Sequence, residues 1–380
     1  MIYFDNSATT KPYKEVVESF VKVSTDFFGN PSSLHRIGGE AEKLLTRGRK
    51  QIAELLEVKP SEIIFTSGGT ESNNLAIKGV ALMHRNRGNH IITTSVEHAS
   101  IRETMNQLQE LGFRITVIPV NKDGRIHVDD IEKAISHNTI LVSVMHVNNE
   151  VGTIQPIKEI GSLLKNYPKI LFHVDNIQGV GKVPLNLYNS SIDLCSFSAH
   201  KFHGLKGTGL LYMKDGVKIS PLLTGGSQEK KQRSGTENVA GVVALAKALR
   251  MTIDNEKKYL SNIVNIKEKL ISELEGIDDI IVHTPREHSA PHIINFSIKG
   301  FKAEVFVHAL EQKDIYVSTT SACSSKKSAA SSTLLAMDVQ EEIAKSAIRI
   351  SLTYENTMEE ALFVIDSIKN TVITLKEVMR

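Results

Sequence analysis

Apolar runs of strand length alternate with helical patterns between about residue 39 and about residue 180, and this alternation constrains the fold more than any other feature. The strand-like runs occupy residues 62–67, 90–96, 113–120, 140–147 and 170–176, and the helical patterns between them occupy residues 39–58, 70–85, 100–112 and 157–167. This order is typical of a mostly parallel sheet covered by helices. Two more strand-like runs follow, at 193–199 and 207–214.

The pattern changes after a long helical segment that runs from Glu237 to Leu274. Strand-like runs at 292–298, 315–320 and 347–352 accompany a helix at 303–312, and an amphipathic helix closes the chain. We interpret this part as a smaller α+β domain. We therefore expect a large domain over residues 16–250 and a small domain made of residues 1–15 and 251–380.

The composition limits the classes of partner that the chain is expected to bind. Its 380 residues carry a formal net charge of +2, which gives no reason to expect a nucleic-acid or membrane surface. Two cysteines cannot form a disulfide framework, and the first residues, MIYFDNSATT, lack the features of a signal peptide. We expect a cytoplasmic protein without a membrane span, whose partners are small molecules or other proteins.

Ligand sites in open α/β sheets lie at the carboxyl ends of the strands, so the residues after each strand are the first candidates. GGTESNN follows the run 62–67 and places Gly69 and Thr70 at the start of a helix. The free backbone N–H groups of a helix start suit a phosphate, although a glycine before a helix is also simply a good turn. The sequence alone leaves both interpretations open.

Polar residues follow the next strands as well. His98 ends one of them, and Asn148 and Asn149 end another; a histidine at a strand end is often only a hydrogen-bonded structural residue. Asp175 and Gln178 follow the run 170–176, where a buried carboxylate needs a donor or cationic partner unless it caps the following turn.

The strongest local signal is SFSAHKFHG, residues 196–204, in which Ser198, His200 and Lys201 stand together after a strand. A lysine beside hydroxyl and imidazole groups in a cleft is the arrangement that a Schiff base with a carbonyl cofactor requires. Pyridoxal phosphate needs such a lysine, a carboxylate for its ring nitrogen and a phosphate site. The chain offers candidates for all three.

Taken together, these motifs resemble the cysteine desulfurase family of the NifS and IscS kind, within the class V aminotransferase group of fold type I pyridoxal phosphate enzymes. The resemblance runs along nearly the whole chain, through YFDNSATTKP, SGGTESNNLAIKG, EHASI, NNEVGTIQPI, HVDNIQGVGK, SFSAHK, RSGTEN, SACSS and IRISL. It implies a mostly parallel seven-stranded sheet flanked by helices, a bound pyridoxal phosphate, no metal and a homodimer.

The resemblance also implies a role for individual residues. Lys201 would bond covalently to the cofactor, Asp175 would pair with its ring nitrogen, Gln178 would reach its hydroxyl, and His98 would stack on the ring and move protons. The remaining implied contacts are Gly69, Thr70, Ser198 and His200 for the phosphate, Thr236 of the partner subunit for the same phosphate, and Asn149 and Arg349 for the substrate carboxylate. An arginine also suits a carboxylate because its guanidinium forms a planar fork.

SACSSKKSAASS, residues 321–332, contains one of the two cysteines and no large apolar side chain. In the family that the chain resembles, a loop cysteine attacks the sulfur of the substrate, and Cys323 matches it. Lys326 and Lys327 would favour its thiolate. Cys195 lies in an apolar strand-like run, so we expect it to be part of the core.

The expected activity is conversion of L-cysteine to L-alanine, with sulfur held as a Cys323 persulfide and passed to an acceptor protein for iron–sulfur cluster assembly or tRNA thiolation. A selenocysteine lyase or another class V aminotransferase would use the same cofactor groups without depending on a mobile thiol. A catalytically silent scaffold for sulfur transfer would be expected to have lost some of Lys201, Asp175, His98 and Arg349, and none is missing.

Overall fold

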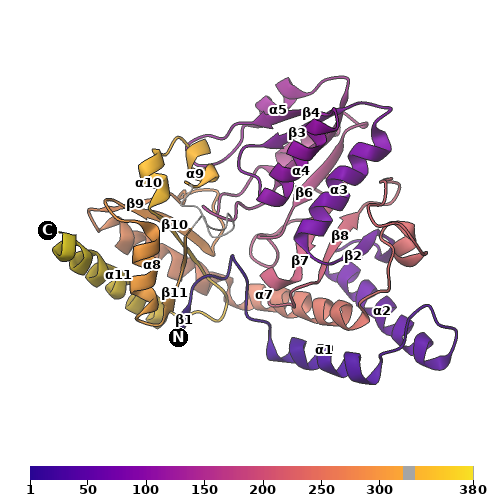
Figure 1. Cartoon of the computed structure of the whole chain (residues 1–380), viewed down its shortest axis with the longest axis horizontal. Coiled ribbons are helices and arrows are strands. Elements are labelled where there is room, and N and C mark those ends of the chain that lie inside the picture. Colours follow the sequence, from indigo (N-terminus) through magenta and orange to yellow (C-terminus); the bar gives the residue numbers. More distant parts are fainter. Residues whose placement is uncertain (320–329, 380) are drawn as a thin grey trace.

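The structure is a computed structural model that describes residues 1–319 and 330–379 (Figure 1). A seven-stranded sheet has the strand order β2-β8-β7-β6-β5-β3-β4. Only β8 runs antiparallel to its neighbours, so the predicted mostly parallel sheet is confirmed. Its strands are β2 (Ile63–Thr66), β3 (His90–Thr94), β4 (Arg114–Ile118), β5 (Thr139–Met145), β6 (Leu171–Asp175), β7 (Leu194–Ser198) and β8 (Gly209–Met213).

Helices cover both faces of this sheet, because successive residues of its strands are apolar and point to opposite sides. Ile64 and Leu141 pack with α3 (Gly69–His84) and α4 (Ala99–Glu110) on one face. Their neighbours Ile63 and Val142 belong to the core on the other face. The helices there are α1 (Lys14–Asp26), α2 (Arg36–Leu55), α5 (Val128–Ala134), α6 (Ile157–Leu164) and the first half of α7 (Val239–Glu275).

A four-stranded antiparallel sheet lies beside the large sheet, with the order β12-β13-β10-β9 (Figure 1). A short parallel pair, β1 with β11, adjoins it. These strands are β1 (Ile2–Tyr3), β9 (Ile280–Val282), β10 (Ile293–Ile298), β11 (Ile315–Tyr316), β12 (Ser318–Thr319) and β13 (Ala347–Ser351), and the helices with them are α8 (Ala303–Glu311), α9 (Ser332–Ala336), α10 (Glu341–Lys345) and α11 (Met358–Met379).

The long helix α7 contributes to two separate cores. Its residues up to Leu249 pack in the core of the large sheet, whereas those from Ile263 onward pack in the core of the small sheet. This division supports the proposed domain boundary near residue 250, which stays a proposal. Within the described residues, no helix combines the length and apolar character that crossing a membrane requires.

The first ten residues connect the two sheets. Phe4 is buried in the core of the small sheet, and Asp5 forms a parallel bridge with Ser351 at the end of β13. A few residues later, the Thr10 N–H donates to the His200 carbonyl oxygen, just beyond β7. The residues between these two contacts therefore lie where the sheets meet.

Candidate active site

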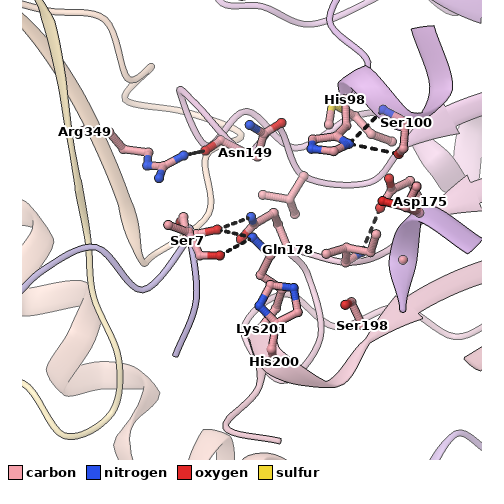
Figure 2. Close-up of a pocket in the computed structure, with 16 residues that line it drawn as sticks. Ser7, His98, Ser100, Asn149, Asp175, Gln178, Ser198, His200, Lys201 and Arg349 are labelled. Atoms are coloured by element: carbon pink, nitrogen blue, oxygen red, sulfur yellow. Dashed lines mark hydrogen bonds between the residues drawn. The ribbon is translucent and has the colours of Figure 1, made fainter. Parts of the chain in front are cut away.

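The strand ends of the large sheet and strand β13 of the small sheet line a cavity of about 250 Å³ (Figure 2). Ten of the predicted site residues line it, and they come from segments far apart in the sequence. They are Gly69, Thr70, His98, Asn149, Asp175, Gln178, Ser198, His200, Lys201 and Arg349. The structure therefore brings together nearly all of the side chains that the strand ends and motifs indicated.

Lys201 ends the short turn Ala199–Lys201 that follows β7, and its side chain enters the cavity. Its Nζ atom donates to the backbone carbonyls of Ser7 and Ala8, the latter at 2.8 Å. Lys182, itself buried, donates from its Nζ to the Lys201 carbonyl oxygen at 3.0 Å. The N-terminal segment thus holds the amine at the cavity wall.

Asp175 ends β6 and is buried. One carboxylate oxygen accepts from the Ile177 N–H at 3.0 Å, and the other accepts from Asn73 Nδ2 at 2.9 Å. Burial raises the pKa of this carboxyl, against these two hydrogen bonds and the nearby charges of His98 and Lys201. Among the described residues it forms no salt bridge, so a cationic nitrogen in the cavity would supply the partner that a buried carboxylate needs.

His98 is the N-cap residue of α4. Its Nδ1 atom lies 2.9 Å from Ser100 Oγ and accepts from the Ser100 N–H at 3.1 Å. Burial lowers the pKa of the imidazole, and the Asp175 carboxylate opposes that shift. Figure 2 shows the Nδ1 edge of the ring turned towards Ser100.

The start of α3 forms the wall beside Ser198. Gly68, its N-cap, has φ of 152° and provides no side-chain cap, so the first N–H groups of the helix are left for another acceptor. A Cβ atom at Gly69 would lie 2.1 Å from Ile177 Cδ1, so a larger residue there would displace the end of that side chain. His200 contributes a neutral donor or acceptor, because burial together with Lys201 lowers its pKa to about 4.

Arg349 on β13 faces the opposite side of the cavity. Its guanidinium donates to the Asn149 carbonyl oxygen at 2.8 Å and pairs with the Asp5 carboxylate at 2.9 Å. Its Nε atom is buried and has no hydrogen-bond partner among the described residues. Asn148 was a candidate together with Asn149, but it does not line the cavity. Its side-chain amide donates to the Val96 carbonyl oxygen.

The remaining residues singled out in the sequence are Thr236, Cys323 and Cys195. Thr236 lines a second cavity next to Ser67 and Thr66, and its expected role in the site of the partner subunit stays a prediction. Cys323 lies outside the described residues. Cys195 is fully buried on β7, which confirms its expected place in the core, and burial raises the pKa of its thiol.

Several residues at the site escaped the sequence prediction. Ser7 and Ala8 act through backbone carbonyls, and Asp5 meets Arg349 only because the two sheets adjoin. Asn73 and Ser100 contact Asp175 and His98 from behind. The only indication of the N-terminal residues was the motif YFDNSATTKP. It belongs to the resemblance with the family, and no hydrophobic pattern or strand end pointed to these residues.

The residues present fit pyridoxal phosphate. The uncapped start of α3 suits a phosphate, and the buried Asp175 carboxylate suits a protonated ring nitrogen. Two buried oxygen atoms at the cavity, Gln178 Oε1 and Ser7 Oγ, have no hydrogen-bond partner among the described residues. A polar ligand would satisfy them.

Known proteins are similar to this chain along nearly its whole length. Residues 2–363 match the aminotransferase class-V family. A NifS/IcsS protein homolog of Lactobacillus delbrueckii subsp. bulgaricus is 52% identical over 363 residues, which cover 95% of this chain and 94% of that protein. The cysteine desulfurase IscS of Dictyoglomus turgidum is 42% identical over 378 residues, covering 99% and 96% of the two chains. The solved structure of a NifS-like protein is similar with a TM-score of 0.92 at 38% identity, covering 99% of each chain.

Proposed function

The chain belongs to the aminotransferase class-V family, and from this premise we propose that it is a pyridoxal-phosphate-dependent cysteine desulfurase that converts L-cysteine to L-alanine. One observation carries the proposal: Lys201, Asp175 and Arg349 meet in a single cavity. They are an amine for a carbonyl cofactor, a buried carboxylate for its ring nitrogen and a guanidinium for a substrate carboxylate. The sequence similarity selects cysteine as the substrate.

The described residues divide the binding of the cofactor among themselves. Lys201 would hold the aldehyde carbon and Asp175 the ring nitrogen, while Gln178 would donate to the ring hydroxyl and His98 would stack on the ring. Gly69, Thr70, Ser198 and His200 would surround the phosphate. When bound, the cofactor serves as an electron sink that makes the substrate's α-carbon acidic.

The protein's own groups then orient the substrate and move its protons. Arg349 and Asn149 bind the α-carboxylate, which fixes the substrate relative to Lys201. Asp5 and the Asn149 carbonyl hold the guanidinium in place. The Lys201 amine, once free, takes the α-proton at Nζ, and the Ser7 and Ala8 carbonyls keep that amine at the cavity wall.

We assign the sulfur transfer to Cys323, on the evidence of the motif SACSS. Its thiolate attacks the substrate sulfur and the carbon–sulfur bond breaks; the electron pair stays with the carbon fragment, which is protonated and leaves as alanine. The protein keeps a Cys323 persulfide, so the reaction balances without an external oxidant. We propose that an acceptor protein in the cytoplasm receives this sulfur, for iron–sulfur cluster assembly or tRNA thiolation.

The assay that tests the function measures both products. Purified protein supplied with pyridoxal phosphate, L-cysteine and a thiol reductant should release alanine and sulfide in equal amounts. Transfer of the amino group to a keto acid without sulfide would identify an aminotransferase, and turnover restricted to selenocysteine would identify a selenocysteine lyase. A protein that binds no cofactor and turns over neither substrate would be a scaffold.

We also propose a homodimer in which Thr236 completes the phosphate site of the partner subunit. In support, Thr236 lines a cavity that also reaches Ser67, directly before the start of α3. Apolar residues on and after α1 are exposed as well, with Phe28 at 72% and Leu34 at 106% of their reference areas. Burial of such side chains would stabilise a dimer.

Mixed dimers test this assembly. A Lys201→Ala chain combined with a Thr236→Ala chain should form dimers in which one site carries both defects and the other carries neither. We expect these mixed dimers to recover roughly half of the wild-type activity, because one of two sites is intact. Activity of the mixture no higher than that of the better parent would contradict a shared site.

A further inference from the structure

Asn73 connects two residues of the active site from behind. It lies on α3 and is fully buried. Its Nδ2 atom is 2.9 Å from Asp175 Oδ2 and 2.9 Å from Ser100 Oγ, so both amide hydrogens have acceptors. Ser100 Oγ in turn lies 2.9 Å from His98 Nδ1. One buried amide therefore connects the carboxylate of Asp175 to the imidazole of His98.

The direction of these hydrogen bonds follows from the groups that make them. An ionised carboxylate only accepts, so the nitrogen of the Asn73 amide faces Asp175, and its Oδ1 is left buried without a partner among the described residues. The reversed amide would place its oxygen against the carboxylate and lose the hydrogen bond to Asp175. Because the Ser100 hydroxyl already receives a hydrogen from Asn73, its own hydrogen is available for His98 Nδ1.

Nδ1 of His98 receives a second hydrogen bond, from the Ser100 N–H at 3.1 Å. Two donors at the same nitrogen leave no place for a proton there. His98 also caps the positive end of α4, a helix of 12 residues, which disfavours a charged imidazolium. The neutral ring must then carry its hydrogen on Nε2, since the hydrogen bond at one ring nitrogen fixes the state of the other. The lowered pKa of His98 agrees with a neutral ring.

We propose that Asn73 and Ser100 are positioning residues that hold His98 as its Nε2–H tautomer, so that the ring offers the substrate a hydrogen-bond donor and not a base. A donor at this place suits an electron-rich substrate atom, such as a thiolate sulfur. The base that takes the α-proton must then be another group, and Lys201 is the amine in the same cavity. The proposal rests on the proposed function, because it assigns His98 a task in that reaction.

Nuclear magnetic resonance of the purified holoenzyme with ¹⁵N-labelled histidine tests the tautomer directly. Long-range couplings between ring nitrogens and ring protons distinguish the two neutral forms, and His98→Gln identifies the signals. We expect wild-type His98 to be the Nε2–H form at neutral pH. In Ser100→Ala, which removes the hydroxyl donor to Nδ1, and in Asn73→Leu, which removes the donor that orients this hydroxyl, the Nδ1–H form should become populated. His98 with its proton on Nδ1 in the wild type would overturn the proposal.

Kinetics separate positioning from loss of stability. Ser100→Ala should lower kcat about tenfold with KM for cysteine changed by less than about twofold, and Ser100→Thr, which keeps the hydroxyl, should restore kcat. Ser72→Ala is the matched control: Ser72 precedes Asn73 on α3 and bonds to Thr66 Oγ1 and the Leu210 carbonyl, away from His98. An unchanged tautomer and kcat in both Asn73→Leu and Ser100→Ala would refute the positioning role. The tautomer is read without turnover, so failure of the proposed activity is a separate result.

Discussion

Replacing Lys201 by alanine should reduce alanine and sulfide production by at least about four orders of magnitude. A positioned general base alone contributes about 10²–10⁴ to a rate, and Lys201 would also hold the cofactor covalently. The cavity around it should stay intact, because its Nζ atom donates to the backbone carbonyls of Ser7 and Ala8, and the Ser7 carbonyl keeps a second donor, Gln178 Nε2. Activity is measured by alanine and sulfide release from L-cysteine.

Chemical labelling identifies the lysine independently of activity. Borohydride reduction of the wild-type protein should fix the pyridoxyl group on the peptide that contains Lys201, and mass spectrometry should find no such group in the Lys201→Ala variant. Lys267→Met is the matched control, because Lys267 is also buried and burial lowers its pKa to about 8, yet it contacts Ser289 and Ala290 away from the cavity. Label on another lysine would contradict the assignment.

The strands of the large sheet and most helices could be predicted, because their apolar residues follow the pattern of burial along the chain. The runs at 140–147 and 193–199 became β5 and β7, whose residues are all buried. An apolar run indicates a buried strand but not its direction relative to its neighbours. The antiparallel direction of β8 was therefore not predicted. The helix α1 was not predicted. Of its apolar residues only Val16 and Val23 are buried. Val17 and Val21 are exposed, so the apolar residues do not repeat with the period of a helix that has one buried face.

The site divides in a similar way. Side chains that follow a strand end, such as Asp175, His98 and Lys201, were predictable because the carboxyl ends of parallel strands meet at one edge. Contacts made by backbone atoms or between distant segments were not, because no local pattern encodes them. The pair of Asp5 with Arg349 joins residues 344 positions apart. Asn73 lies within a helical pattern, so the sequence suggests only that it packs inside the protein. It gives no indication that Asn73 contacts both Asp175 and Ser100.

The two cysteines should respond to replacement in opposite ways. Cys323→Ser keeps the size of the side chain but removes the readily ionised nucleophile, so only sulfur transfer should fail. Cofactor binding and the spectral change on adding cysteine should persist, because the residues proposed to hold the cofactor are untouched. Alanine and sulfide production should fall by at least about three orders of magnitude, since a hydroxyl near its ordinary pKa is a weak nucleophile.

Cys195→Ala is the control that separates chemistry from packing. Cys195 is fully buried and its pKa is raised by burial, so its thiol is neither accessible nor readily ionised. Its replacement should leave the rate of alanine release within about twofold of wild type and lower the free energy of unfolding by about 1–2 kcal/mol, through the small cavity that remains. Rates are measured with L-cysteine, and stability by denaturant unfolding. If Cys323→Ser released alanine as fast as the wild type, sulfur transfer would not pass through a Cys323 persulfide, and a lyase or aminotransferase mechanism would take its place.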